Sequence, residues 1–435
     1  MVERLRVAMI SLHTNPLAQP GVGNAGGMNV YVRQLAASLA QLGVEVELFT
    51  RLDSAPLSSD TLALGADNSS VLPIVTEVSP GVRLWQIPTQ NQGEIPKEEL
   101  YAELESFSAR VWEVIQGFGK DWVQLIHSHY WLSGLSGIEL AALLQVPLVH
   151  AMHTMGRTKN AALAPGDRPE PLSRLLGETE IAQKANALIA ATPHEAHELE
   201  THYGANPAKV VVIPPGVDRS VFKPGLAQAH YRTVLDFAGL NIPAAAKVIL
   251  FAGRIQRLKN PGVLVRALAA DGQIPPDTYL VILGGASGHF TSSIDESELA
   301  KLAERLGVAD RVRILAPVPP ARLADWYRAA DVVAVPSYSE SYGLVAAEAI
   351  ASGTPVVAAQ VGGLATIVDD GVTGRFVASH DPEDWALVLG DVLSDVIERA
   401  KLAAACRSES RLFGWDRTAA ETLALYRALI PESYD

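Results

Sequence analysis

The sequence predicts an α/β protein made of two doubly wound, Rossmann-like domains that face each other across a cleft. Short runs rich in Val and Ile, apolar on both faces, alternate with amphipathic helix patterns along the chain. These patterns form two successive series, separated by a linker that contains Pro224 and Gly225. The 435 residues, 48% of them hydrophobic, supply enough apolar material for two sizeable cores.

The first series defines a predicted N-terminal domain at residues 1–217. Its strand patterns lie at 5–11, 44–50, 82–88, 123–129, 146–153, 186–192 and 209–216. Amphipathic spacing predicts helices at 28–42 and 97–117. Residues 53–80 are polar and weakly patterned, which indicates a loop.

The second series defines a predicted C-terminal domain at residues 218–414. Its strand patterns lie at 247–253, 278–285, 311–317, 331–337 and 354–360. One helix is expected to begin at Pro261, with Asn260 as its cap. Residues 415–435 contain an amphipathic helix with no strand after it, and we expect this helix to join the N-terminal domain.

Composition argues against several classes of protein. The net charge of −13 disfavours a nucleic acid or an acidic membrane surface as partner. No apolar run approaches the roughly 20 residues that span a bilayer, and the first residues do not form a signal-peptide pattern. The single cysteine, Cys406, excludes an intramolecular disulfide and a multi-cysteine metal site. We therefore expect a cytoplasmic protein without membrane insertion.

The stretch "QPGVGNAGGMN" contains a G-x-G-x-x-G pattern at Gly21, Gly23 and Gly26, as dinucleotide-binding turns do. Its context differs from such turns, because the preceding strand ends ten residues earlier, near Ser11. Arg51 also stands where the ribose-binding acid is expected. Gly26 and Gly27 directly precede a predicted helix, whose free N–H groups attract anions. The loop is predicted to cradle a phosphate or sugar.

The stretch "FAGRIQRLKN" places Arg254 and Lys259 just after a buried strand. A planar guanidinium and a lysine point charge at the mouth of an acidic protein suit a diphosphate. A solvated basic loop is an equally good interpretation of this stretch alone.

Glu340 precedes a predicted helix in "SESYGLVAAEAIASG", and Glu348 lies eight positions later, about two turns on, so both are expected to project on one side of that helix. The amides of residues 341–344 would form a second helix start that attracts anions. The carboxylates suit sugar and ribose hydroxyls. A solvated helix face is the alternative, which the alanine-rich surroundings disfavour.

Together these motifs resemble retaining glycosyltransferases of family four, which have the GT-B fold, and the resemblance covers nearly the whole chain. It is strongest in "RVAMISLHTNPLAQPG", "LIHSHYWLSG", "HTMGRTKN" and "VAVPSYSESYGLVAAEAIASGTPVVAAQVGGL". The members most similar move N-acetylglucosamine from UDP-GlcNAc to 1D-myo-inositol 3-phosphate, the first step of mycothiol biosynthesis. Small-molecule substrates and a possible homodimer are implied.

The resemblance also implies roles for individual residues. His153 and Glu340 would contact the transferred sugar. The donor would be bound by Gln19, Pro20, Gly27, Arg254, Lys259, Val318, Glu340 and Glu348. The acceptor would be bound by His13, Asn24, Ala25, Gly26, Gly27, Met28, Asn29, Lys97, Tyr130, Thr154 and Arg174, of which Lys97, Tyr130, Thr154 and Arg174 would grip its phosphate.

The sequence departs from this family at two places. Asn24-Ala25 stands where a carboxylate and a hydroxyl are frequent, and Val318 stands where an arginine can occur. The implied chemistry is a front-face transfer with retention that requires no cofactor, so the glutamate pair is not a glycosidase acid and nucleophile. A structural Mg²⁺ would bind near Tyr327, Arg328, Ala330 and Thr354.

Four alternatives remain open at this stage. They are a transferase with another sugar-phosphate acceptor, similar to sucrose-phosphate synthase, a UDP-sugar 2-epimerase, a dinucleotide oxidoreductase and a non-catalytic binding module. The phosphate grip argues against the epimerase, which needs no second phosphate. The histidine-rich segment 193–204 lacks the H-E-x-x-H spacing and is predicted to be a surface helix. His127 and His129 are expected on one face of a strand end, in a structural or cleft-lining role.

Overall fold

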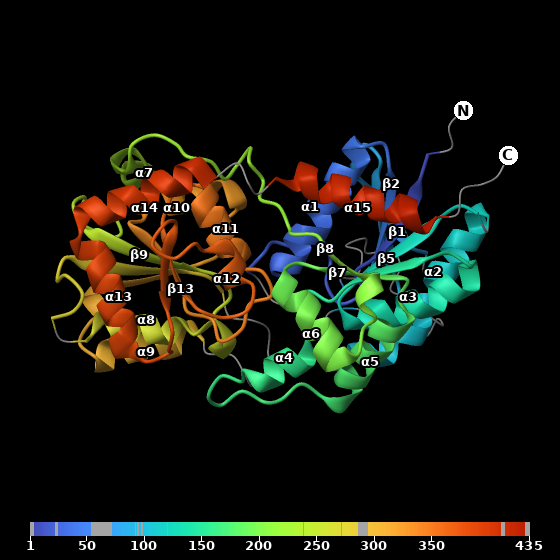
Figure 1. Cartoon of the computed structure of the whole chain (residues 1–435), viewed down its shortest axis with the longest axis horizontal. Coiled ribbons are helices and arrows are strands. Elements are labelled where there is room, and N and C mark those ends of the chain that lie inside the picture. Colours follow the sequence, from blue (N-terminus) through green and yellow to red (C-terminus); the bar gives the residue numbers. More distant parts are fainter. Residues whose placement is uncertain are drawn as a thin grey trace, which may run out of the picture.

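The computed structural model contains two α/β lobes, each with a largely parallel sheet between layers of helices (Figure 1). The structure describes residues 4–21, 25–53, 72–91, 93, 95–96, 99–119, 121–237, 239–270, 272–285, 295–409 and 414–430. The predicted fold class, two doubly wound Rossmann-like units, is confirmed.

The first sheet has eight strands in the order β3-β4-β2-β1-β5-β6-β7-β8. Every neighbouring pair is parallel except β3 and β4. The strands are β1 (Arg6–Ile10), β2 (Glu45–Arg51), β3 (Ile74–Ser79), β4 (Val82–Ile87), β5 (Leu125–His129), β6 (Leu148–Ala151), β7 (Ala187–Ala190) and β8 (Val210–Val212).

The expectation of a loop over 53–80 is wrong at its end, where β3 forms the edge of the sheet. Residues 75–77 of this strand are exposed, so it lacks the apolar run that marks a buried strand. Residues 54–71 of that prediction lie outside the described residues.

The second sheet has six parallel strands in the order β11-β10-β9-β12-β13-β14. They are β9 (Lys247–Ala252), β10 (Thr278–Leu283), β11 (Val312–Leu315), β12 (Val332–Val335), β13 (Val356–Ala359) and β14 (Gly374–Val377). The sequence analysis missed β14, because this short edge strand begins "GR" and has only two apolar residues.

Alternate residues of the central strands enter different cores, which explains their apolar character on both faces. Val7 and Met9 of β1 pack in one core, and Ala8 and Ile10 pack in the other.

The N-terminal half contains helices on both faces of its sheet. They are α1 (Gly27–Gln41), η2 (Leu100–Glu103), α2 (Leu104–Phe118), α3 (Trp131–Leu144), α4 (Gly156–Ala161), α5 (Leu172–Lys184), α6 (Pro193–Tyr203) and η3 (Pro207–Lys209). The helix expected at 28–42 is confirmed as α1. The one expected at 97–117 is η2 followed by α2, which begins later than predicted.

The second half contains α7 to α14 around its sheet, and α15 returns to the first lobe (Figure 1). The bounds are α7 (Gln228–Val234), η4 (Arg257–Lys259), α8 (Pro261–Leu268), α9 (Glu296–Arg305), η5 (Ala309–Arg311), α10 (Pro320–Ala329), α11 (Leu344–Ala351), α12 (Leu364–Ile367), α13 (Pro382–Ser394), α14 (Val396–Glu409) and α15 (Trp415–Leu429). Asn260 precedes α8 as predicted, but its side chain makes no capping hydrogen bond.

Helix α15 packs beside α1 on the first sheet. Leu35 of α1 and Ala419 and Tyr426 of α15 lie in the same core as Val7 and Met9. The chain crosses between the lobes twice, and the two crossings lie side by side at a β-bridge between Val217 and Gly414.

Candidate active site in the cleft between the lobes

A cavity of about 1200 Å³ lies between the two lobes and receives residues from both. Nearly all the described residues that the sequence predicts to bind substrate line it. They are His13, Pro20, Gly26, Gly27, Met28, Asn29, Tyr130, His153, Thr154, Arg174, Arg254, Lys259, Val318, Glu340 and Glu348. The predicted residues Asn24 and Lys97 lie outside the described residues.

Two of the described residues predicted to bind substrate stand apart from that lining. Gln19 and Ala25 are not among the described residues that line the cavity. The Gln19 side chain instead reaches across the cleft, where Nε2 lies 3.4 Å from the carbonyl oxygen of Pro317 and donates to it.

The starts of two helices face each other in this cavity. A side chain on Gly27, the first residue of α1, would come within 3.2 Å of Leu344, the first residue of α11. Gly26 likewise faces the guanidinium of Arg254 at 3.5 Å. The two lobes therefore come close together at these glycines, and free N–H groups of both helices point toward one space. This arrangement suits an anion.

Asn29 shapes the glycine loop from inside. Its Oδ1 accepts from the Gly26 N–H at 2.9 Å, and its Nδ2 donates to Thr14 Oγ1 and to the Asn15 carbonyl. Because Asn29 is 1% exposed and its amide is used in these contacts, its part in the site is to hold the loop in shape.

The cations of the second lobe differ in their partners. Lys259 forms an ion pair with Glu340, which also accepts from Ser337 Oγ at 3.0 Å. Arg254 lies against Gly26, and burial lowers the pKa of its guanidinium. Arginine remains charged despite such a shift, so a buried positive charge faces the glycine loop of the other lobe.

As expected, Glu340 precedes the helix that carries Glu348. Helix α11 begins only at Leu344, after Gly343 with φ of 102°. Glu340 therefore lies in the preceding loop, where its carbonyl accepts from the Gly363 N–H at 2.9 Å. Both glutamates line the same cavity.

Glu348 is buried on α11. Its Oε2 accepts from the Tyr327 hydroxyl at 2.9 Å. Burial raises the pKa of this carboxyl to about 7, and the Tyr327 hydrogen bond counteracts part of that rise. The group thus titrates near neutral pH.

On the opposite wall, Arg174 is held by three neighbours. Its Nε donates to Glu178 at 2.6 Å, and its Nη2 donates to both the carbonyl and Oγ1 of Thr154 at 2.9 Å. The guanidinium carbon lies 5.0 Å from the centre of the Tyr130 ring. Three of the four predicted phosphate ligands therefore meet.

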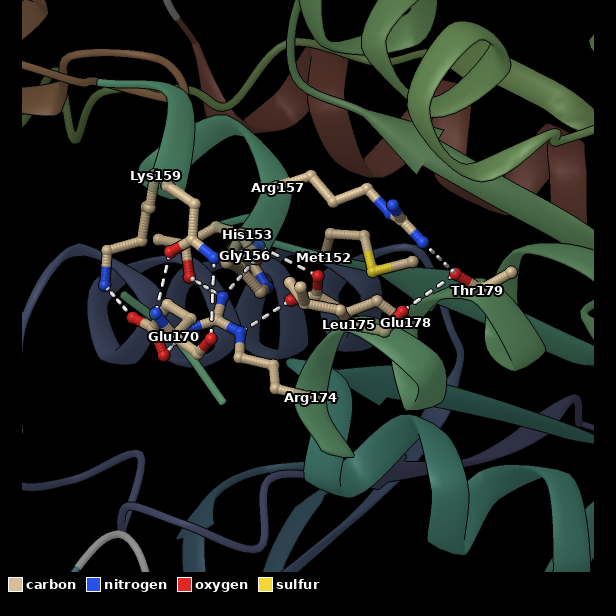
Figure 2. Close-up of polar contacts among 12 residues, drawn as sticks. Met152, His153, Gly156, Arg157, Lys159, Glu170, Arg174, Leu175, Glu178 and Thr179 are labelled. Atoms are coloured by element: carbon tan, nitrogen blue, oxygen red, sulfur yellow. Dashed lines mark hydrogen bonds and ion pairs between the residues drawn. The ribbon is translucent and has the colours of Figure 1, made fainter. Parts of the chain in front are cut away.

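Glu170 also binds Arg174 and was not selected from the sequence. Its Oε2 lies 2.9 Å from Arg174 Nη1, and its other oxygen forms an ion pair with Lys159. Figure 2 shows Lys159 and Arg174 converging on this carboxylate. The sequence offered a hint only for Lys159, which belongs to the quoted stretch "HTMGRTKN".

His153 joins the two lobes. Its backbone carbonyl accepts from Ser341 Oγ at 2.5 Å, and its Nε2 lies 3.0 Å from Nδ1 of His129. Burial lowers the pKa of His153 to about 3, so the imidazole is neutral at pH 7. Tyr130 and His153 both have positive φ, 74° and 59°, as strained residues at functional sites often do.

His127 and His129 lie on one face of β5, as predicted, with ring centroids 4.2 Å apart. His127 Nδ1 lies 2.6 Å from the hydroxyl of Tyr426 on α15, so this histidine connects the C-terminal helix to the sheet. Both are fully buried, which confirms the structural interpretation.

Glu195 is a further cavity residue that sequence reasoning missed. It lies on the inner side of α6, the helix predicted from 193–204. Its Oε2 accepts from the Ala191 N–H at 2.8 Å, and burial raises its pKa to about 7. The histidine-rich segment that contains Glu195 was considered only as a metal site, so this glutamate was not selected.

The described part of the chain contains no group of three or more His, Cys, Asp or Glu side chains arranged to hold a metal. The expected Mg²⁺ position consists of backbone oxygens that already have partners. The Tyr327 carbonyl accepts from Thr354 Oγ1 at 2.7 Å, and the Ala330 carbonyl accepts from Gln228 at 2.9 Å. A cation there would have to share these oxygens.

Arg51 is not in a nucleotide site. Its guanidinium donates to the carbonyls of Leu52, Asn91 and Gly93 and so ties down the loop after β4. These contacts agree with the interpretation that the glycine loop is not a dinucleotide-binding turn. No helix within the described ranges is long and apolar enough to cross a bilayer.

Two family models match the chain. The model "Glycosyl transferase 4-like domain" matches residues 26–216, and the model "Glycosyl transferases group 1" matches residues 235–409. The first covers most of the first lobe and the second covers the sheet of the second lobe.

Several curated proteins and solved structures are similar to this chain. A D-inositol 3-phosphate glycosyltransferase of Xylanimonas cellulosilytica is 50% identical over 97% of this chain and 96% of its own length. One from Streptomyces scabiei is 47% identical over 97% and 91%. Sucrose-phosphate synthase from Thermosynechococcus elongatus has a TM-score of 0.85 and 31% identity, covering 98% of this chain and 99% of that one. Anabaena HepE in complex with UDP-glucose has a TM-score of 0.72 at 21% identity, covering 97% and 100%, and shares the fold.

Proposed function

The chain belongs to the retaining family-four glycosyltransferases with the GT-B fold, and we propose that it transfers N-acetylglucosamine from UDP-GlcNAc to 1D-myo-inositol 3-phosphate, the first step of mycothiol biosynthesis. The observation that carries the proposal is a pair of anion sites on opposite walls of one cavity. Arg254, Lys259 and two helix starts form one, and Arg174 with Thr154 forms the other. A diphosphate donor and a phosphorylated acceptor need such a pair.

On the donor side of the cavity, the protein stabilises the charge that develops during transfer. As the bond between C1 of the sugar and the diphosphate breaks, negative charge grows on the leaving phosphate. Arg254, Lys259 and the amides at the starts of α1 and α11 stabilise that charge without rearrangement. Glu348 would accept hydrogen bonds from the ribose hydroxyls, Val318 would lie near the base, and Gln19 and Pro20 would contact the donor.

On the acceptor side of the cavity, the protein positions the hydroxyl that attacks the sugar. With its phosphate held by Arg174, Thr154, Tyr130 and Lys97, the inositol presents a hydroxyl to C1 on the face that the diphosphate leaves. The hydroxyl oxygen bonds to C1, and its proton passes to the leaving phosphate. His153 is neutral and therefore orients the transferred sugar by hydrogen bonding, together with Glu340.

No cofactor is needed for this chemistry, and the UDP-sugar is a substrate. A structural Mg²⁺ near Tyr327, a homodimer and a cytoplasmic location remain predictions. The domain boundaries that we propose are 1–217 and 218–414, with 415–435 part of the first domain. The position of α15 beside α1 supports this division.

The test is a transfer assay with mass detection of products. UDP-GlcNAc and UDP-glucose are each incubated with inositol 3-phosphate, unphosphorylated inositol and fructose 6-phosphate. We expect N-acetylglucosamine on inositol 3-phosphate and none on unphosphorylated inositol. Transfer only to fructose 6-phosphate would show a sucrose-phosphate-synthase-like enzyme. Conversion of UDP-GlcNAc to its 2-epimer without transfer would overturn the proposal.

A further inference from the structure

We propose that the Glu170 carboxylate stands in for the acceptor phosphate, occupying the position between Lys159 and Arg174 until the substrate displaces it. Lys159 then becomes a further phosphate ligand. This inference rests on the proposed function, because it takes the Arg174 wall as the acceptor site.

The nitrogens of Arg174 show which position the ligand takes. Nε is committed to Glu178, which is fully buried, and Nη2 is committed to Thr154. Nη1 is the nitrogen turned toward Glu170. A phosphate that binds Arg174 at Nη1 therefore meets the position that the Glu170 oxygen now holds.

Lys159 completes this position. Its ammonium forms an ion pair with the second oxygen of the same Glu170 carboxylate, so one carboxylate bridges two cations from α4 and α5 (Figure 2). A phosphomonoester offers several oxygens in a similar space and carries more negative charge. Lys159, Glu170 and Arg174 all line the cavity, so an incoming ligand can reach them.

Arg174 does not need Glu170 to stay in place. The contacts to Glu178 and Thr154 remain when Glu170 leaves, and Glu178 is itself fixed by the Gly156 N–H at 2.8 Å and the Tyr203 hydroxyl at 2.6 Å. Removal of Glu170 therefore leaves a guanidinium that Glu178 and Thr154 still position, with Nη1 deprived of its carboxylate partner.

Glu170 can move at small structural cost. It lies in an irregular segment between α4 and α5, so its displacement breaks no helix or strand. Its backbone is held locally by Asn160, whose Oδ1 accepts from the Glu170 N–H at 2.7 Å. The side chain can turn away while this anchor remains.

The test compares Glu170→Gln with the wild type and with Glu180→Gln as control. Glu180 lies on the same helix as Arg174, but its ion pair with Lys184 is exposed. Binding of inorganic phosphate is measured by calorimetry without other substrates, and KM values for donor and acceptor are measured by transfer. We expect Glu170→Gln to bind inorganic phosphate about tenfold more tightly than the wild type and to lower the acceptor KM about tenfold. This is the scale of the loss of one competing charge-assisted contact. Lys159→Gln should weaken phosphate binding and raise the acceptor KM. Neither variant should change the donor KM.

Unchanged or weaker phosphate binding by Glu170→Gln, with a normal donor KM, would overturn the inference and show that Glu170 only supports the site. The same measurement on Glu170→Ala, in which the side chain is removed, tests whether the glutamine amide itself affects phosphate binding. The proposed function fails separately, through absence of transfer by the wild-type enzyme. The two failures are therefore distinguishable.

Discussion

At the scale of single residues, Arg174 shows how the proposed acceptor site is organised before any substrate binds. Its guanidinium is 1% exposed and anchored at two nitrogens, so little side-chain entropy remains to be lost when a ligand binds. The same anchoring makes the residue costly to remove, since Glu178 would be left as a buried carboxylate without its cation.

We expect Arg174→Ala to raise the acceptor KM by about a hundredfold, on the scale of a lost charge-assisted contact of about 3 kcal/mol, and to leave the donor KM nearly unchanged. Steady-state kinetics with each substrate varied in turn measure the split, and Arg174→Lys tests the geometry with the charge kept. Arg157→Ala on α4 is the control, since Arg157 packs on Tyr203 instead. Equal effects on both KM values would contradict the acceptor assignment.

Glu348 gives a pH-dependent prediction. Its folded-state pKa is raised from 4.5 to about 7 by burial, so its contribution to stability is fully present below pH 4.5 and is lost as the pH rises through about 7. Glu348→Gln removes this loss and can still accept from Tyr327. The melting temperature of the variant, relative to wild type, should therefore be higher at pH 8 than at pH 5.

Scanning calorimetry at several pH values checks that difference. Glu304→Gln on the exposed side of α9 serves as control, and its offset from wild type should stay constant over the same range. A constant offset for Glu348→Gln as well would show that the carboxyl is not titrating near neutral pH.

At the scale of elements, the two chain crossings between the lobes are packed against each other. A side chain on Gly216 would lie 2.4 Å from the Trp415 nitrogen and 2.6 Å from the Gly414 carbonyl carbon. Backbone atoms cannot move aside as a flexible side chain does. The crossing therefore needs glycine for space.

We expect Gly216→Ala to destabilise the protein by about 1–3 kcal/mol through overpacking. Gly117→Ala is the control, because Gly117 lies exposed in α2 with no atom near its added carbon. That change should stabilise the helix by about 0.5–1 kcal/mol. Urea denaturation of both variants measures the contrast, and similar values for the two would contradict it.

The sequence predicted elements well where burial dictates composition. Strands such as β1 and β9, covered on both faces, carry continuous apolar runs that the pattern reveals. The edge strands β3 and β14 lack such runs and were missed. The pattern placed Glu340 before the helix that carries Glu348, but spacing alone does not show the left-handed Gly343 after which α11 begins.

The candidate site was predictable only in part, for the same physical reason. Cations next to buried strands, such as Arg254, stand out in the sequence. The pairing of Glu170 with Lys159 depends on how an irregular segment folds back, and no periodicity encodes that.

At the scale of the whole molecule, polar contacts join the two lobes across the cleft. Gln19 donates to Pro317, Ser341 donates to the carbonyl of His153, and Arg257 donates to the carbonyl of Gly166 at 2.8 Å. Gly166 belongs to the segment that carries Glu170. The segment after β9 in one lobe is thus tied to the irregular segment before α5 in the other.

Helix α15 completes the core of the first lobe, so we expect its removal to unfold that lobe. Tyr426→Phe is the milder test: it deprives His127 of its partner and should cost about 1 kcal/mol in stability without changing either KM. Thermal unfolding and steady-state kinetics measure these two effects. A changed acceptor KM with unchanged stability would contradict the structural assignment of Tyr426.

The return of α15 also determines how the chain carries mechanical load. The described chain begins at Arg4 and ends at Ile430, and both ends lie on the first lobe (Figure 1). The second lobe is therefore spliced into the first as an insertion whose entry and exit touch at Val217 and Gly414. A force applied between the ends would stretch the first lobe and bypass the second. Fluorescent labels at Arg4 and Ile430 would likewise report on the first lobe and not on the second.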